Sequence, residues 1–436
     1  MATRFVLLLF AGVSLAWAPT PAVAQGAAAM DTLSLAEAYR LAEASNPMLA
    51  ATRARTEAVR SLESSAKLPP DPQLSVGVMN ASLPGLETDM ATSMAPAIEV
   101  MQMVPLPGKL GLAGEIARKE TEIAGAEADE TRWMVRARTA MEFYEIYQAD
   151  RQLETMRGTL RLLEDFEKVA RAMYASGEGR QADVLRAGVG VARMRAEIER
   201  MAAMREAAVA RLNGVLNRPA DTPVPAVSYP DVPEVLPTAE TLRLWAEGSR
   251  PLLLRSSLAV EQAEARSDLA RRELWPDLSI GFQYGQNEMA GMGTERMGSL
   301  MLGVNVPIFA RQRQLKMREE AAAMERMAEA ERGDALAQVR ARIGELLAEM
   351  GRARTLAELY RTEVLPQAEA AVQSAFSSYR VGAVDFMTLV DARMTVNEYE
   401  QELFALQAEY GRLVAELEMT IGLELPHTSQ TTTEDR

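Results

Sequence analysis

Residues 74–78 read Leu-Ser-Val-Gly-Val, and residues 278–282 read Leu-Ser-Ile-Gly-Phe. The same short strand-like motif therefore occurs twice, 204 positions apart (278 − 74 = 204). A second pair has the same spacing and precedes the first, LAEASNPML at residues 41–49 and WAEGSRPLL at residues 245–253. A duplication of about 200 residues indicates one body built from two similar halves.

The duplication extends toward the end of each half. Val104-Pro105-Leu106 corresponds to Val306-Pro307-Ile308, and Tyr174-x-x-Gly177 corresponds to Tyr379-x-x-Gly382. Each half then has the order helix, strand, loop, strand, long helix, break, helix. We divide the chain into a signal peptide (1–24), a first repeat (25–218), a proline-rich linker (219–237), a second repeat (238–425) and a polar tail (426–436).

Four short segments alternate apolar and polar residues, which predicts strands with one apolar face. In the third segment Leu278, Ile280 and Phe282 alternate with Ser279 and Gly281. We expect strands at about 73–80, 97–104, 277–285 and 299–308, with a Gly- and Met-rich loop over 287–298.

Long helices follow each pair of strands. No proline occurs between Lys109 and Tyr174, and Glu, Ala, Arg, Met and Leu dominate that stretch. A helix of this length would extend about 100 Å at about 1.5 Å per residue. We predict long helices over 109–216 and 314–418, of a kind suited to coiled-coil packing, with an interruption at Pro366 and turns at Gly177 and Gly382.

The first residues have the pattern of a secretory signal peptide. Arg4 precedes the apolar run 5–17, and Ala22-Val23-Ala24 forms a small-x-small cleavage site. We therefore expect an exported protein. No later stretch reaches the ~18 continuous apolar residues of a transmembrane helix.

The composition argues against several classes of function. The net charge of −14 disfavours a nucleic-acid surface. The chain has no cysteine, and its only histidine, His427, lies in the polar tail. A histidine triad, a thiolate metal site and attachment of lipid to an N-terminal cysteine are therefore excluded. No nucleotide-binding glycine loop occurs. We expect neither an enzyme nor a cofactor.

Four strands of about nine residues can cross a bilayer when they are tilted. One chain cannot close them into a barrel, and open strand edges in hydrocarbon leave unpaired backbone groups at several kcal/mol each. Three chains would supply about 12 strands, a number found in bacterial barrels. The alternative is a soluble periplasmic helical scaffold or adaptor that carries small sheets.

The sequence resembles the TolC family of outer-membrane efflux proteins over nearly the whole mature chain. The resemblance rests on the duplicated element order, the paired Asn-Pro and Arg-Pro helices, the Ser-x-Gly strands and the two Tyr-x-x-Gly turns. The stretch Val-Pro-Leu-Pro-Gly-Lys at 104–109 is similar to the heavy-metal branch of CusC and CzcC.

The resemblance implies a mainly α-helical homotrimer with a 12-stranded transmembrane β-barrel in outer-membrane lipid and a helical tunnel through the periplasm. The partners that it implies are a periplasmic adaptor (membrane fusion protein) and an inner-membrane pump of the resistance-nodulation-division (RND) type. The implied substrates are heavy-metal cations such as Cu(I) and Ag(I), or Co, Zn and Cd. Multidrug efflux and type I protein secretion are the alternatives for the same fold.

The resemblance places the periplasmic entrance of the channel at Gly177 and Gly382. The gate residues that the resemblance implies are Asp183, Tyr379 and Asp391, and Asp385 is an additional acid nearby that we include in the candidate gate. Val384 and Thr388 depart from the best-known member of the family, which has an arginine and an aspartate at these positions. As an alternative, the acids are residues of helix N-terminal turns, where the helix dipole favours negative charge.

Methionine is unusually frequent, with 26 residues. Several lie on the predicted strands and their loops: Met79, Met90, Met94, Met101, Met103, Met289, Met292, Met297 and Met301. Thioethers are soft ligands that suit Cu(I) or Ag(I), and the candidate ligands are Met79, Met90, Met94, Met289, Met292 and Met297. The alternative is that methionine fills apolar positions.

Overall fold

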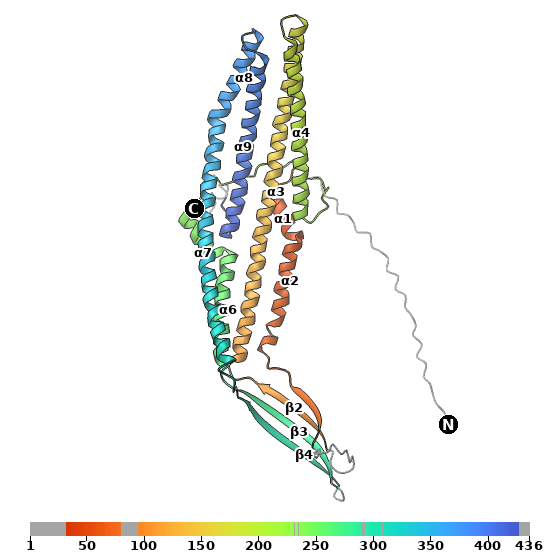
Figure 1. Ribbon diagram of the computed structural model, residues 1–436, viewed down its shortest axis with the longest axis vertical. Helices are drawn as coiled ribbons and strands as arrows, with labels where there is room; N and C mark the ends of the chain where they lie inside the picture. Colours follow the sequence, from red (N-terminus) through yellow and green to blue (C-terminus); the bar gives the residue numbers. More distant parts are fainter. Residues whose placement is uncertain are drawn as a thin grey trace, which may run out of the picture.

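The computed structural model describes residues 32–79, 95–230, 232–233, 235–289, 293–306 and 308–426. The molecule is elongated, with helices along most of its length and a single sheet at one end (Figure 1). The predicted signal peptide and the tail from residue 427 onward lie outside the described residues.

The sheet contains four antiparallel strands in the order β1-β2-β3-β4. The strands are β1 Gln73–Met79, β2 Ala95–Val104, β3 Asp277–Met289 and β4 Gly293–Asn305. Each half of the chain contributes one hairpin, and the pairing of β2 with β3 joins the two halves. The strand pairing and the apolar alternation that the sequence predicts are therefore confirmed within the described residues.

The second hairpin is longer than predicted. The ladder continues through Gln286↔Arg296 to Met289↔Gly293, across most of the stretch that we expected to be a loop. Strand propensity depends on cross-strand partners, so the polar residues of this stretch pair despite their composition. At the other end, β4 stops at Asn305 and not at Ile308, because a proline cannot donate to the ladder and Pro307 follows closely.

The helices also follow the duplication. In the first half they are α1 Leu35–Ser45, α2 Pro47–Leu62, α3 Lys109–Ala175 and α4 Gln181–Val215. In the second half they are α5 Ala239–Ser249, α6 Pro251–Arg272, α7 Gln314–Leu359, α8 Leu365–Arg380 and α9 Phe386–Ile421. A short 3₁₀ turn, Ser65–Lys67, follows α2. The predicted 109–174 helix is thus confirmed, with 67 residues.

The interruption predicted at Pro366 is a local widening of the helix. A π-helical segment, Tyr360–Val364, separates α7 from α8, and Pro366 lies in the first turn of α8. Proline lacks an N–H and its ring crowds the preceding turn. A wider turn before it therefore lets the helix pass without a break.

The junction between the first two helices of each half, α1–α2 and α5–α6, is stabilised by different residues in the two halves. Asn46 caps α2 by accepting from the Met48 N–H, and it donates to the Val215 carbonyl at the end of α4. Arg250 is its counterpart and donates to the Thr420 carbonyl near the end of α9. Arginine cannot cap a helix N-terminus, so the Glu130 carboxylate of α3 accepts from the Leu252 N–H in its place, at 3.0 Å.

The last helix of each half ends in a left-handed residue, Asn217 with φ +52° and Gly422 with φ +73°. A Cβ at position 422 would come within 2.6 Å of the Ser249 carbonyl oxygen. Glycine is therefore required at Gly422 by close backbone approach as well as by dihedral angle.

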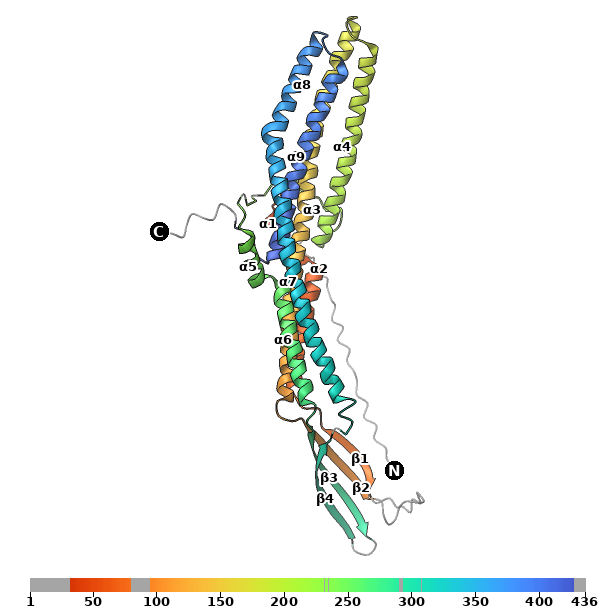
Figure 2. The ribbon, with the colours of Figure 1, turned by 60° about the vertical axis from the view of Figure 1, so that its left-hand side comes forward.

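Three buried clusters hold the helices together. Two lie near mid-length, where α1 and α5 flank the long helices and α5 stands on the outside (Figure 2). The third lies at the end opposite the sheet and unites α3, α4, α8 and α9. The linker after α4 crosses the middle of the molecule, where the Pro233 carbonyl accepts from the buried Tyr410 hydroxyl at 2.8 Å.

Candidate functional site

The two predicted entrance turns lie together at the end of the molecule opposite the sheet (Figure 1). Gly177 (φ +80°) connects α3 to α4, and Gly382 (φ +71°) connects α8 to α9. Glycine adopts this left-handed conformation without the steric cost of a side chain. Because buried side chains of all four helices form one cluster here, the two turns are held as one unit.

Tyr379 belongs to this buried cluster and is only 5% exposed. Its ring packs edge-on against Phe386, with the centroids 5.4 Å apart. Burial, and after it the negative charge of Asp183, raises the pKa of the Tyr379 phenol. The counterpart Tyr174 is 48% exposed. The two Tyr-x-x-Gly turns are therefore not equivalent in packing.

The three acids of the predicted gate occupy different environments. The Asp385 carboxylate caps α9 and accepts from the Thr388 N–H at 3.0 Å and hydroxyl at 2.9 Å. These hydrogen bonds lower the pKa of Asp385, which fits the helix-terminus alternative. Asp183 is partly buried and acts electrostatically on Tyr379. The exposed Asp391 side chain has no hydrogen bond or ion pair within the described residues.

At the other end of the molecule, the strand register separates the sheet into two faces. Even-numbered positions form the apolar face, with exposed fractions from 37% at Tyr284 to 78% at Leu302. Its exposed members are Leu74, Val76, Ile98, Val100, Val104, Leu278, Ile280, Phe282, Tyr284, Leu300, Leu302 and Val304. A contiguous exposed apolar surface of this kind marks a membrane or protein contact.

Odd-numbered positions form the polar face. One row across the strands is Ser75, Glu99, Gln283 and Ser299, and the next is Gln73, Met101, Gly281 and Met301. The methionines whose side chains the structure describes on the strands all lie on this face: Met101, Met103, Met297 and Met301. These four therefore do not fill positions on the apolar face. The side chains of Met79, Met90, Met94, Met289 and Met292 lie outside the described residues.

Sequence reasoning missed a buried lysine at the junction between sheet and helices. The Lys109 side chain is 6% exposed, and its Nζ donates to Asp277 Oδ1 at 2.8 Å and to the Trp275 carbonyl at 3.1 Å. Asp277 Oδ1 also accepts from the Leu106 N–H at 3.1 Å. Lys109 thereby ties the bend after β2 to the first residue of β3. The signal in the sequence was the lysine that ends the Val104–Lys109 motif.

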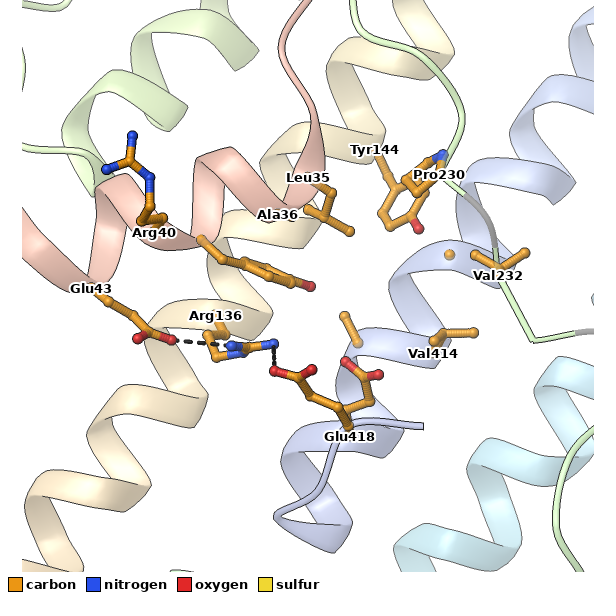
Figure 3. A pocket seen from close by; sticks show the side chains of 14 residues that line it. Leu35, Ala36, Arg40, Glu43, Arg136, Tyr144, Pro230, Val232, Val414 and Glu418 are labelled. Carbon is orange, nitrogen blue, oxygen red and sulfur yellow. Dashed lines mark hydrogen bonds and ion pairs between the residues drawn. The ribbon is translucent and has the colours of Figure 1, made fainter. Parts of the chain in front are cut away.

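A cavity of about 510 Å³ lies near mid-length between α1, α3, α9 and the linker (Figure 3). Its charged groups are already engaged. Arg136 bridges Glu43 at 3.2 Å and Glu424 at 2.5 Å, and the Glu418 carboxylate accepts from the Leu425 N–H. These contacts hold the end of α9 against α3 and α1. We therefore interpret the cavity as part of the structural scaffold and not as a binding site.

Within the described segments, no group of three or more His, Asp or Glu side chains comes together in a way that could hold a metal ion. Among the helices that the structure describes, none combines the length and the apolar character that crossing a membrane requires.

The sequence matches the outer membrane efflux protein family over residues 38–218 and 245–423, which correspond to the two halves of the fold. The chain belongs to the outer membrane efflux protein family. A search of curated protein sequences gave no match. The match to this family identifies the chain as an outer-membrane efflux channel protein of the TolC type, which confirms the predicted channel function.

Solved structures of this family share the fold. VceC of Vibrio cholerae is 17% identical with a TM-score of 0.75, and the match covers 89% of this chain and 96% of VceC. CusC is 16% identical with a TM-score of 0.75, covering 89% and 92%. MtrE of Neisseria gonorrhoeae, solved in an open state, is 19% identical with a TM-score of 0.74, covering 91% of each chain.

Proposed function

We propose that this protein is the exit duct of a tripartite efflux system, assembled as a homotrimer in the outer membrane. The exposed apolar face of the sheet carries the proposal. β1 and β4 lie at the two edges of the sheet in one protomer. Unpaired edges in hydrocarbon cost several kcal/mol per backbone group. Pairing β4 of one copy with β1 of the next removes both edges and gives a 12-stranded barrel.

The helices supply the second part of the duct. α3 has 67 residues and extends about 100 Å at about 1.5 Å per residue. Three copies side by side would enclose a tunnel that crosses the periplasm. A periplasmic adaptor and an inner-membrane RND-type pump complete the system and deliver the substrate to the end that bears Gly177 and Gly382. The duct itself is passive and needs no cofactor.

The test is purification of the mature protein in detergent, followed by mass determination and recording in planar bilayers. We expect a trimer that requires detergent for extraction and conducts ions in discrete steps. A monomer that dissolves in plain buffer without conductance would instead support the soluble scaffold.

For the substrate we propose heavy-metal cations, such as Cu(I) and Ag(I), or Co, Zn and Cd. The proposal is supported by the Val104–Lys109 resemblance and by the methionines on the polar face of the sheet. A strain lacking the gene should lose tolerance to these metals. Unchanged metal tolerance with new sensitivity to dyes and detergents would favour multidrug efflux, and failure to export a protein substrate would favour type I secretion.

We also propose that Asp183, Tyr379, Asp385 and Asp391 form the periplasmic gate of the trimer. The support is their position at the tip, with Asp183 acting on Tyr379 and the exposed Asp391 unpaired within the described part of the chain. Three copies of each acid around the axis would attract cations to the entrance.

Asp183→Ala, Tyr379→Phe and Asp391→Ala are each expected to raise the single-channel conductance, because each removes a polar group that holds the tip closed. Asp165→Ala is the matched control, since Asp165 is an exposed acid of α3 whose ion pair within the described residues is with Lys168 of the same helix. Conductance equal to wild type in all three gate variants would remove the gate assignment.

A further inference from the structure

The polar face of the sheet has a gap at Gly281. In the register, Gly281 lies between Met101 of β2 and Met301 of β4. Directly opposed residues in adjacent antiparallel strands have Cβ atoms about 4.5–5.5 Å apart. A residue without a side chain between two methionines leaves room for both flexible thioethers to lean over it.

The side chains around the gap converge on it. A Cβ built at Gly281 would lie 3.4 Å from Met301 Cε and 3.8 Å from Glu99 Oε1. Glu99 is two residues from Met101 on β2 and therefore lies on the same face. Met301 of β4 and Glu99 of β2 thus approach the position above Gly281, and Met101 of β2 lies directly opposite Gly281 in the register on the same face.

The Glu99 carboxylate is available. Within the described residues it has no hydrogen bond or ion pair, although it is partly buried. The other carboxylate described on this face, Asp277, is already paired with Lys109. An unpaired carboxylate in a partly buried setting favours a nearby positive charge.

We propose that Met101, Met301 and Glu99 form a binding site for a soft monovalent cation, Cu(I) or Ag(I), on the inner wall of the barrel. Thioether sulfurs select such ions, and the carboxylate neutralises a single positive charge. That this face lines the lumen rests on the proposed function.

Two further methionines extend the site along the same face. Met103 lies two residues beyond Met101 toward the helices, and Met297 lies four residues from Met301 toward the outer end of the strands. At about 3.3 Å per residue, these steps are about 7 and 13 Å. Conduction requires several sites that bind weakly enough to release the ion, and a row of thioethers meets this requirement.

The test is titration of the purified trimer in detergent with Ag(I) nitrate in chloride-free buffer. Isothermal titration calorimetry gives the stoichiometry and affinity. We expect the double variant Met101→Leu/Met301→Leu to bind one silver ion fewer per protomer than wild type. Leucine keeps the size and apolar character and removes only the sulfur. Glu99→Gln should weaken this site about tenfold, which corresponds to about 1.4 kcal/mol.

The matched control is Met317→Leu/Met324→Leu on α7, where both methionines are exposed, at 45% and 48%. It should bind as many silver ions as wild type. An unchanged stoichiometry in the strand variant, or an equal loss in the control, overturns the site.

Trimer mass and conductance, measured on the same samples, separate this proposal from the proposed function. A conducting trimer without methionine-dependent silver binding removes only the metal site. A monomer that does not conduct but loses silver in the strand variant removes only the channel.

Discussion

Replacement of Leu300 by arginine is expected to prevent assembly of the trimer in the outer membrane. Leu300 is 72% exposed on the apolar face and pairs with Phe282 of β3. An arginine on the lipid face of a barrel costs about 2–4 kcal/mol near the bilayer midplane. In the proposed trimer the cost arises in each of three protomers, so it would accumulate in the assembled barrel. The measurement is the amount of trimer in outer-membrane fractions.

The adjacent residue provides the matched control. Ser299 lies on the polar face and pairs with Gln283, so Ser299→Arg introduces the same charge on the opposite side of the same strand. We expect this variant to assemble as wild type and to conduct cations less well, because in the proposed trimer three arginines would face the lumen. Equal assembly of both variants would contradict the assignment of the two faces.

The sequence was sufficient to predict which face of each strand is apolar. Alternation with a period of two is a local property, and a shift by one residue would bring every side chain to the other face. Leu278, Ile280 and Phe282 therefore lie on the predicted side. The duplication likewise predicted the matched element order, because both halves fold under the same local rules.

Features that depend on distant partners could not be predicted. The extension of β3 to Met289 requires β4 as a partner, and the composition of that stretch alone indicated a loop. The different burial of Tyr174 and Tyr379 is also hidden in identical local motifs, because it results from the packing of Tyr379 against Phe386 and the third buried cluster.

Lys109 is the clearest example of a feature that depends on a partner distant in the sequence. Its partner Asp277 is 168 residues away in the sequence, and no local pattern connects the two. The first-half counterpart of Asp277 in the duplication is Gln73 (277 − 73 = 204), which carries no charge, so this ion pair also breaks the symmetry between the repeats. A search for the duplicated motif would therefore not have found it.

Replacement of Lys109 by methionine is expected to lower the free energy of unfolding by about 3 kcal/mol, the lower end of the cost of removing one partner from a buried ion pair. Methionine fills the space of the aliphatic chain but leaves the Asp277 carboxylate, only 20% exposed, without its cation. Asp277 keeps the hydrogen bond from the Leu106 N–H, which limits the loss. The measurement is the denaturation midpoint of the purified protein in detergent.

Two further variants separate the charge from the packing. Lys109→Met/Asp277→Asn should recover most of the stability, because asparagine still accepts from Leu106 and no longer leaves a charge unpaired. Lys316→Met is the control, since Lys316 is 66% exposed and its pair with Glu319 on one helix contributes about 0.5 kcal/mol or less. If Lys109→Met were no more harmful than Lys316→Met, the bend after β2 would be held by backbone geometry alone, and the sheet and the helices would be joined without a charged anchor.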